Sequence, residues 1–140
     1  MMENLRERRS EEGFSLIELI VVIVILALLA SVVGSNVMGK LGEGRNRIAK
    51  IQISEFDGAL QMYIFDMGRL PTTAEGLEAL TRNTAGSDNW NGPYLKKSVP
   101  NDPWERPYAY RSPGDHGDYD IFSFGADGNE GNDDDICSWK

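Results

Sequence analysis

The amino-acid sequence predicts an α+β fold, in which a long N-terminal helix precedes a small domain built on antiparallel strands. Residues 14–33 are almost entirely apolar, and residues 49–67 carry an apolar stripe with helical spacing. Further along, residues 107–111 and 119–124 are two aromatic-rich runs on either side of a Pro/Gly turn. Because about a hundred of the 140 residues follow the apolar run, the chain has room for one such domain and not two.

The apolar run Phe14–Val33 is long enough to cross a membrane as a helix. Its 20 residues, at about 1.5 Å each, match the roughly 30 Å hydrocarbon core of a bilayer. A secretory signal peptide fits less well, because its apolar region is only about 7–15 residues long. Glu18 lies inside the run, and a carboxylate in lipid usually has a charged partner. Arg6, Arg8 and Arg9 precede the run and predict that this end faces the cytoplasm.

Residues 34–67 are predicted to form a soft joint followed by an amphipathic helix. The apolar positions follow one another at spacings of three and four residues, which is typical of one helical face. These positions are Ala49, Ile53, Phe56, Leu60, Tyr63 and Met67. Each glycine costs a helix about 1 kcal/mol relative to alanine, so the glycines between residues 34 and 44 predict flexibility. Close packing of helices is the alternative explanation for them.

Residues 68–140 are predicted to form the small domain. Thr72 and Glu75 have the spacing of a capping box, which predicts a short helix through about residue 80. The two aromatic runs predict an antiparallel hairpin. Ile136 and Trp139 are expected to anchor the polar C-terminal segment in the core.

Carboxylates are concentrated near the C-terminus. The whole chain has a net charge of -8. Residues 101–140 contain ten Asp/Glu but only three Lys/Arg. This acidity disfavours nucleic acid, which requires a basic patch. Oxygen ligands interspersed with glycines suit calcium, whereas zinc prefers clusters of His and Cys. A solvated acidic tail is the alternative interpretation of the same residues, which are Asp127, Glu130, Asp133, Asp134 and Asp135.

The sequence offers no catalytic constellation. No nucleophile stands at a recognised spacing from a base, so the chain is predicted not to be an enzyme. His116 lies in a turn and is expected to be a polar surface residue. Cys137 is the single cysteine, so the chain forms no internal disulfide.

Several motifs resemble one family. Gly13-Phe14-Ser15-Leu16-Ile17-Glu18, followed by the apolar run, resembles the class III signal peptides of type IV pilins and pseudopilins. Tyr63–Leu80, the turn motif Asn101-Asp102-Pro103-Trp104 and the C-terminal segment Asp120–Trp139 are similar to the major pseudopilins of type II secretion systems. The resemblance extends over nearly the whole chain from Gly13.

The resemblance implies how the chain is processed and assembled. A prepilin peptidase would remove the leader peptide 1–13 by cutting after Gly13, and would methylate the new amine of Phe14. Glu18 would neutralise the amine of a neighbouring copy as subunits leave the inner membrane and stack into a homopolymer. This pseudopilus would lie in the periplasm and drive export of folded proteins, together with minor pseudopilins and the inner-membrane secretion platform.

The resemblance also implies a calcium site in a loop spanning residues 124–136, on a small antiparallel sheet packed against the long helix. By similarity, the side-chain ligands would be Asp127, Asp134 and Asp135. Backbone carbonyls around Phe124 and Asn132 would complete the set.

The chain departs from the family pattern at the leader and in the helix. Ser35 stands where the family usually has a helix-breaking proline, and Glu11 and Glu12 lie beside the cleavage site where basic or neutral residues are commoner. The alternative within the same superfamily is a subunit of a type IV pilus for adhesion or motility. Such pilins often carry a paired-cysteine loop near the C-terminus, and Cys137 has no partner in this chain.

Overall fold

The structure is a computed structural model that describes residues 13–140 and divides the chain into two compact units at the Gly39–Lys40 boundary. The basic residues Arg6, Arg8 and Arg9, with Glu11 and Glu12, lie outside the described residues. The expected cytoplasmic orientation and the leader sequence therefore stay predictions.

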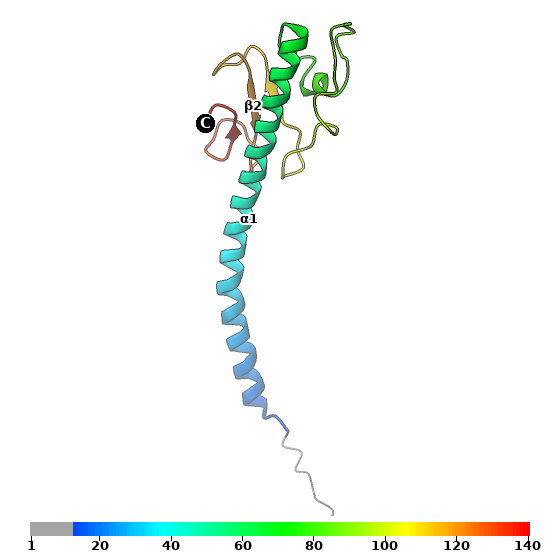
Figure 1. The fold of residues 1–140 in the computed structure, drawn as a ribbon. Helices are drawn as coiled ribbons and strands as arrows, with labels where there is room; N and C mark the ends of the chain where they lie inside the picture. Colours follow the sequence, from blue (N-terminus) through cyan, green and yellow to red (C-terminus); the bar gives the residue numbers. More distant parts are fainter. Residues whose placement is uncertain (1–12) are drawn as a thin grey trace, which may run out of the picture. The chain divides into compact units, whose positions relative to one another are not determined.

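The first element is helix α1, Leu16–Met67, which is 52 residues long (Figure 1). Ser15 caps its start, because the amide of Glu18 donates to the Ser15 hydroxyl over 3.2 Å. Gly68 ends it with φ +69°, a left-handed conformation that glycine adopts without strain. The helix continues through Ser35, whose hydroxyl donates to the Val32 carbonyl at 3.0 Å. The glycines of residues 34–44 thus do not interrupt the helix, and the softness of this joint stays a prediction.

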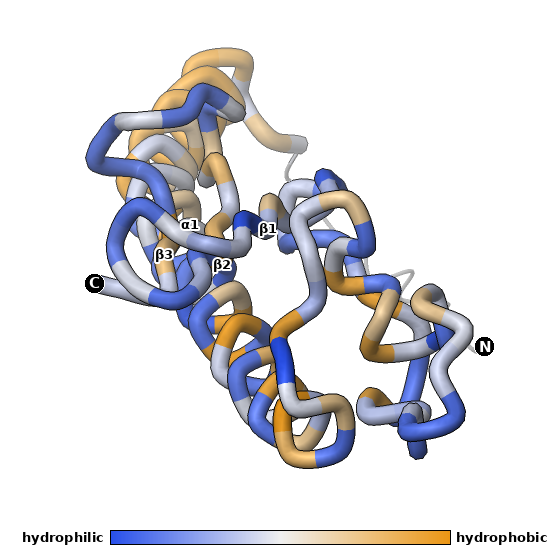
Figure 2. The backbone as a smooth tube through the Cα atoms, turned by 90° about the horizontal axis from the view of Figure 1, so that it is seen from above, coloured by the Kyte–Doolittle hydropathy of each residue, from blue (hydrophilic) through white to orange (hydrophobic). Residues whose placement is uncertain are grey.

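The N-terminal half of α1 is apolar and exposed. Leu16, Ile17 and Leu29 have 76%, 67% and 59% of their surface accessible, and other apolar side chains of the run are similarly uncovered. Figure 2 shows these N-terminal turns as mainly hydrophobic. Among residues 13–140, α1 is the one helix long and apolar enough to cross a membrane. Burial within residues 13–140 therefore does not explain the apolar composition of this half.

The second unit contains a three-stranded antiparallel sheet in the order β1-β2-β3. Its strands are β1 (Ala109–Arg111), β2 (Asp120–Ser123) and β3 (Ile136–Cys137). Tyr110 pairs with Ile121, and Phe122 pairs with Cys137. The predicted hairpin is confirmed as β1–β2. Strand β3 was not predicted, because two residues are too few to show an alternating pattern.

The C-terminal half of α1 supplies one wall of the core. The predicted stripe is buried, apart from Met67, which is partly buried. Phe56 meets Tyr108 edge to face, with ring centroids 5.1 Å apart. The core residues opposite the helix come from the 3₁₀ helix η1 (Leu77–Leu80), from the segment before β1 and from the strands. They are Leu77, Ala79, Leu80, Tyr108, Tyr110, Ile121 and Ile136.

The capping box is present, but the helix it introduces differs from the prediction. The Thr72 amide donates to Glu75 Oε2 at 2.7 Å, and the Glu75 amide donates to the Thr72 hydroxyl at 3.2 Å. The regular element that follows is a 3₁₀ helix, η1, Leu77–Leu80. Gly76, with φ +63°, separates this element from the capping turn. A continuous α-helix from Thr72 is therefore wrong, because a left-handed residue cannot continue a right-handed helix.

Three tyrosines attach the loops and sheet to the polar edges of α1. Each hydroxyl donates to a side chain of the helix, so the contact combines an apolar ring with a polar anchor. The pairs are Tyr108 with Gln52, Tyr119 with Asp57 at 2.9 Å, and Tyr94 with Asp66 at 2.8 Å. These bonds position the sheet, and the loop that carries Tyr94, against α1 within the second unit.

Candidate functional site: the N-terminal junction and the C-terminal loop

The predicted processing site lies just before α1. Gly13 and Phe14 are exposed and non-helical, and Phe14 has 87% of its surface accessible. A β-carbon added at Gly13 would meet nothing within 4 Å. The Gly13–Phe14 peptide bond thus lies outside the hydrogen-bonded helix, between two exposed residues.

Glu18 lies in the first turn of α1. A carboxylate there is favoured by the helix dipole, by about 0.3–1 kcal/mol at an exposed site. The ion pairs formed within residues 13–140 do not include Glu18. The local structure thus accounts for its place at the helix start, but supplies no cationic partner.

The C-terminal loop, defined as residues 124–135, joins β2 to β3 and is held at both ends. The pairing of Ser123 with Ile136 closes its base. Arg106 donates to the Gly125 carbonyl at 3.0 Å, and the Gly125 amide donates to the Ser123 hydroxyl at 3.2 Å. Ser123 in turn donates to the buried carboxylate of Asp102 at 2.6 Å. This network fixes where the loop leaves the sheet.

Gly125 permits the two ends of the loop to meet. Its φ is +67°, and a β-carbon there would lie 2.1 Å from the Asp134 carbonyl oxygen. No other residue fits this position without moving the backbone. The start of the loop is therefore packed directly on the segment that carries Asp134 and Asp135.

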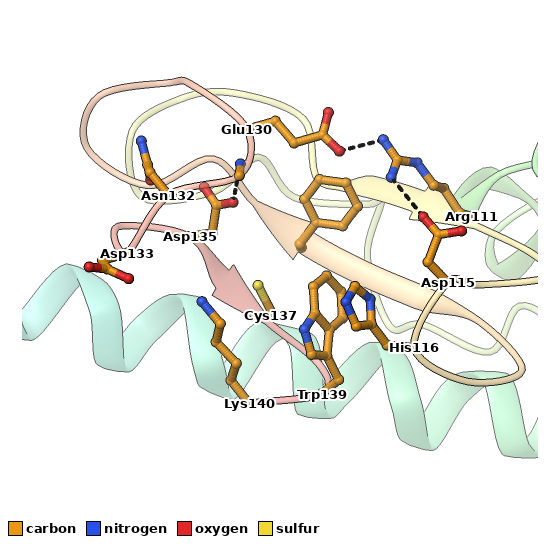
Figure 3. Close-up of a pocket in the computed structure, with 12 residues that line it drawn as sticks. Arg111, Asp115, His116, Glu130, Asn132, Asp133, Asp135, Cys137, Trp139 and Lys140 are labelled. Atoms are coloured by element: carbon orange, nitrogen blue, oxygen red, sulfur yellow. Dashed lines mark hydrogen bonds and ion pairs between the residues drawn. The ribbon is translucent and has the colours of Figure 1, made fainter.

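The predicted ligands Asp127 and Asp135 already bind groups of the loop. Asp127 accepts hydrogen bonds from the Asn129 amide, at 2.9 Å, and from the Asn132 side-chain amide. Asp135 Oδ2 accepts from the Gly131 amide at 2.7 Å (Figure 3). The other oxygen of Asp135, Oδ1, is buried and has no hydrogen-bond partner among residues 13–140. Asp134 is exposed.

The oxygen atoms of this loop are of the chemical type that binds calcium. Burying an unpaired carboxylate oxygen is costly, and a cation would offset that cost at Asp135. Carboxylate and carbonyl oxygens are the ligands calcium prefers. Within residues 13–140, however, no three side chains of His, Cys, Asp or Glu converge in a preformed metal cluster. Calcium binding therefore stays a prediction, and the observation that supports it is the buried oxygen Oδ1 of Asp135.

A cavity of about 340 Å³ lies beside the loop (Figure 3). Arg111 crosses it, pairing with Glu130 at 2.5 Å and with Asp115 at 3.6 Å. The Arg111 guanidinium also lies 5.0 Å from the centre of the Phe122 ring. Since Arg111 already compensates Glu130, this carboxylate is the least available of the loop for a cation.

His116 is an exposed residue, as predicted, but its contacts were not foreseen. Its ring stacks on Trp139, with centroids 3.9 Å apart, and its Nδ1 lies 3.0 Å from the buried Asp120. Burial raises the pKa of Asp120, but hydrogen bonds from the His116 ring and the Asp115 and His116 amides outweigh it, so this pKa is lowered. Through these bonds Asp120 orders the β1–β2 turn, and the stack of His116 on Trp139 ties this turn to the C-terminal segment.

The structural role of Asp102 was not predicted from the sequence either. It is 4% exposed and accepts the amides of Trp104 and Arg106, at 3.0 and 2.9 Å. An Asp in a turn that accepts an amide two residues later is a recognised pattern, and the Asp102-Pro103-Trp104 sequence carried that signal. The long-range bond to Ser123 carried no signal in the sequence.

Two family models match the chain. Residues 36–139 match type II secretion system protein G, and residues 8–34 match the prokaryotic N-terminal methylation motif. The chain belongs to the type II secretion system protein G family.

Protein G relatives are similar over nearly their whole length. The type II secretion system core protein G of Pseudomonas aeruginosa is 43% identical over 139 residues, covering 95% of this chain and 98% of the relative. That of Vibrio cholerae is 40% identical over 142 residues, covering 97% of each. The crystal structure of the major pseudopilin of enterohaemorrhagic Escherichia coli matches with 33% identity and a TM-score of 0.66, over 73% of this chain and 88% of that one.

Membership of the protein G family confirms the resemblance stated from the motifs and favours a major pseudopilin over a type IV pilus subunit. The predicted α+β architecture of long helix and small antiparallel sheet is confirmed as well.

Proposed function

We propose that this chain is the structural major subunit of a type II secretion pseudopilus, anchored in the inner membrane before it polymerises in the periplasm. The observation that carries the proposal is the exposed apolar half of α1, which begins directly after a non-helical Gly13–Phe14 junction. A surface of this kind suits lipid first and other subunits later. Polymerisation would then drive the export of folded proteins.

Processing by a prepilin peptidase would create the N-terminus of the mature subunit. Cleavage after Gly13 leaves Phe14 with a free amine, which the same enzyme would methylate. The match to the N-terminal methylation motif supports this step, as does the exposure of both residues. The new amine is cationic at neutral pH.

Glu18 would accept the cationic amine of Phe14 from a neighbouring copy. The carboxylate forms no ion pair within residues 13–140, and it belongs to an apolar run. Inside a fibre both charges would be removed from water, where breaking such a pair costs about 3–5 kcal/mol. The pairing would therefore favour one register between subunits as they leave the membrane.

Calcium would bind the C-terminal loop through oxygens of Asp127, Asp134 and Asp135, with backbone carbonyls near Phe124 and Asn132. Its charge would compensate carboxylates that otherwise repel one another and keep the loop open. The unpartnered oxygen of Asp135 supports this role. Minor pseudopilins and the inner-membrane secretion platform are the further partners that the family assignment supports.

Replacing Glu18 by Ala tests the assembly role. We expect the Glu18→Ala variant to insert in the inner membrane and to be cleaved like the wild type, but to yield no fibres. Glu43→Ala is the matched control, since Glu43 is exposed on the same helix outside the apolar run. Fibres of normal length and number from Glu18→Ala, seen by electron microscopy, would reject the pairing.

A further inference from the structure

Helix α1 carries a short basic segment between the apolar run and the acidic remainder of the chain. We define the basic segment as residues 40–50, which have a net charge of +3. Residues 51–140 contain seven Lys/Arg and sixteen Asp/Glu, a net charge of -9. The charged residues of the basic segment are Lys40, Glu43, Arg45, Arg47 and Lys50. Positive charge is therefore concentrated close to the apolar run, and negative charge lies further along the chain.

The cations of the basic segment have no charged partner among residues 13–140. All four side chains are exposed, and the ion pairs of the described chain include none of them. Glu43 lies three residues after Lys40 and four before Arg47, which are spacings at which helical ion pairs form. It nevertheless pairs with neither residue in this structure. The fold of the described chain therefore does not use these charges.

The basic segment begins at the distance from the apolar run at which lipid headgroups are expected. Lys40 follows Val33 by seven residues, which is about 10 Å at about 1.5 Å per residue. The polar interface of a bilayer extends roughly 5–8 Å beyond the hydrocarbon core on each side. Arg45 lies about 8 Å beyond Lys40, which is within about one Debye length. Long cationic side chains also extend toward an interface, which shortens both distances.

The cations lie on more than one side of α1. At 3.6 residues per turn, Arg45 and Arg47 are separated by about 200° around the helix axis. Lys40 is seven residues from Arg47 and lies on the same side as Arg47. A protein partner would contact one face of the helix, whereas lipid headgroups surround a helix where it leaves the bilayer. The arrangement therefore fits a lipid surface better than a single protein face.

We propose that the basic segment binds the headgroups of anionic phospholipids, with Lys40 and Arg45 closest to the bilayer. The inference rests on the proposed function, since it takes the apolar half of α1 as a membrane anchor. Anionic lipids attract basic segments next to a membrane span, and arginine binds phosphate oxygens with two parallel hydrogen bonds. The contact would hold the subunit at the membrane surface until it polymerises.

Lipid binding to the unassembled chain tests this proposal. The full-length chain in neutral detergent micelles is mixed with phosphatidylglycerol, which is anionic, and phosphatidylcholine, which is neutral overall. Native mass spectrometry then counts the lipids of each kind that the chain retains. We expect at least about fivefold more phosphatidylglycerol than phosphatidylcholine on the wild type, and a smaller preference as ionic strength rises.

Two variants with the same change in net charge locate the contact. Lys40→Gln/Arg45→Gln should lose most of the preference for phosphatidylglycerol. Lys96→Gln/Lys97→Gln should keep it, because these two exposed lysines lie far along the chain from the apolar run. The exchange variant Lys40→Arg/Arg45→Lys should also keep the preference, since it retains both charges. Melting followed by circular dichroism checks that all three variants fold like the wild type.

Several outcomes would overturn the lipid contact. Equal retention of both lipids by the wild type would show that the segment does not select anionic headgroups. Equal losses in the two glutamine variants would show that net charge alone sets the preference. If Lys40→Gln/Arg45→Gln kept the preference but formed no fibres in cells, the cations would bind the acidic part of a second copy instead. The micelle assay uses unassembled chains, so failure of the wild type to form fibres would count against the proposed function alone.

Discussion

Glu75 is a carboxylate held by three hydrogen bonds at the end of α1. Both terminal nitrogens of Arg69 donate to it, at 2.8 and 2.9 Å, and the Thr72 amide adds a third bond at 2.7 Å. The hydrogen bonds from Arg69 are the main cause that lowers the pKa of Glu75 to about 2. These three residues fix the turn that leads from α1 to η1, so the ionisation of Glu75 affects the fold of the second unit.

Acid should weaken the domain through Glu75. Because its pKa is lower in the folded chain than the ordinary 4.5, the stabilisation is complete above about pH 4.5 and is lost as pH falls towards 2. We expect a loss of about 1 kcal/mol, less than the pKa shift alone implies, because the Arg69 side chain is 43% exposed and partly screened. Unfolding of the full chain in micelles, followed by circular dichroism between pH 6 and 2, measures it.

The Glu75→Gln variant removes this dependence. It should be less stable at pH 6 and lose less than the wild type on acidification. Glu78→Gln is the control, since Glu78 forms an exposed pair with Arg82 at 3.3 Å. Parallel stability curves for the wild type and Glu75→Gln over that window would contradict the role of the ion pair.

Single residues were predictable from the sequence where a local pattern defined them. Thr72 and Glu75 form the predicted capping box because its two hydrogen bonds span three residues. Asp102 and Asp120 were not recognised, because their burial depends on partners far along the chain or across a turn. The burial of the Asp135 Oδ1 atom was not predicted either, because the burial of a single atom follows from tertiary packing.

At the scale of elements, the C-terminal loop is held by residues that lie outside it. Its base is held by the pairing of Ser123 with Ile136 and by Arg106. If calcium binds there, the full chain in micelles should melt several degrees higher with millimolar calcium than with excess chelator, since a ligand stabilises the state that it binds. Equal melting temperatures would remove the calcium proposal.

A matched pair of variants locates the ion. Asp135→Asn should abolish the calcium-dependent increase in melting temperature, because it removes the charge beside the unpartnered oxygen. Glu130→Gln should retain most of it, because Arg111 already pairs with Glu130. An identical response of both variants to calcium would place the ion elsewhere.

Long elements were predicted more reliably than short ones. The stripe from Ala49 to Met67 repeats its helical period often enough to define both the helix and its buried face. Strand β3 has only two residues, and its pairing with β2 depends on the loop that precedes it. The 3₁₀ geometry of η1 followed from Gly76, whose left-handed backbone the sequence pattern did not reveal.

At the scale of the whole molecule, the tyrosine anchors hold the second unit together. Tyr119 donates to Asp57 at 2.9 Å. Burial raises the pKa of Asp57, and the bond from Tyr119 partly offsets that increase. Tyr119→Phe should therefore lower the free energy of unfolding by about 1–2 kcal/mol at neutral pH, because it leaves a half-buried carboxylate without its donor.

A double-mutant cycle tests the Tyr119 contact. Denaturant unfolding of the wild type, Tyr119→Phe, Asp57→Asn and the double variant should give a coupling energy of about 1 kcal/mol. Tyr94→Phe, which removes the bond to Asp66, provides a comparison at the end of the helix. Additive effects of the Tyr119 and Asp57 substitutions would show that the two side chains do not stabilise each other.

The sequence predicted the architecture of the molecule because its two halves differ so strongly in composition. A run of apolar residues and a helical stripe are both visible without knowledge of tertiary contacts. Ile51, Met62 and Phe65 are apolar like the core residues, but they lie off the predicted stripe and are exposed in the structure.

The tyrosine anchors also have a kinetic consequence. Tyr108 and Tyr119 bind helix residues that lie 56 and 62 positions earlier in the chain. Local helical contacts form in about a microsecond, whereas closing such long loops is slower and depends on the topology of the whole domain. During folding, the chain should therefore pass through a stage in which α1 is formed but its core stripe, Ala49 to Met67, is still uncovered.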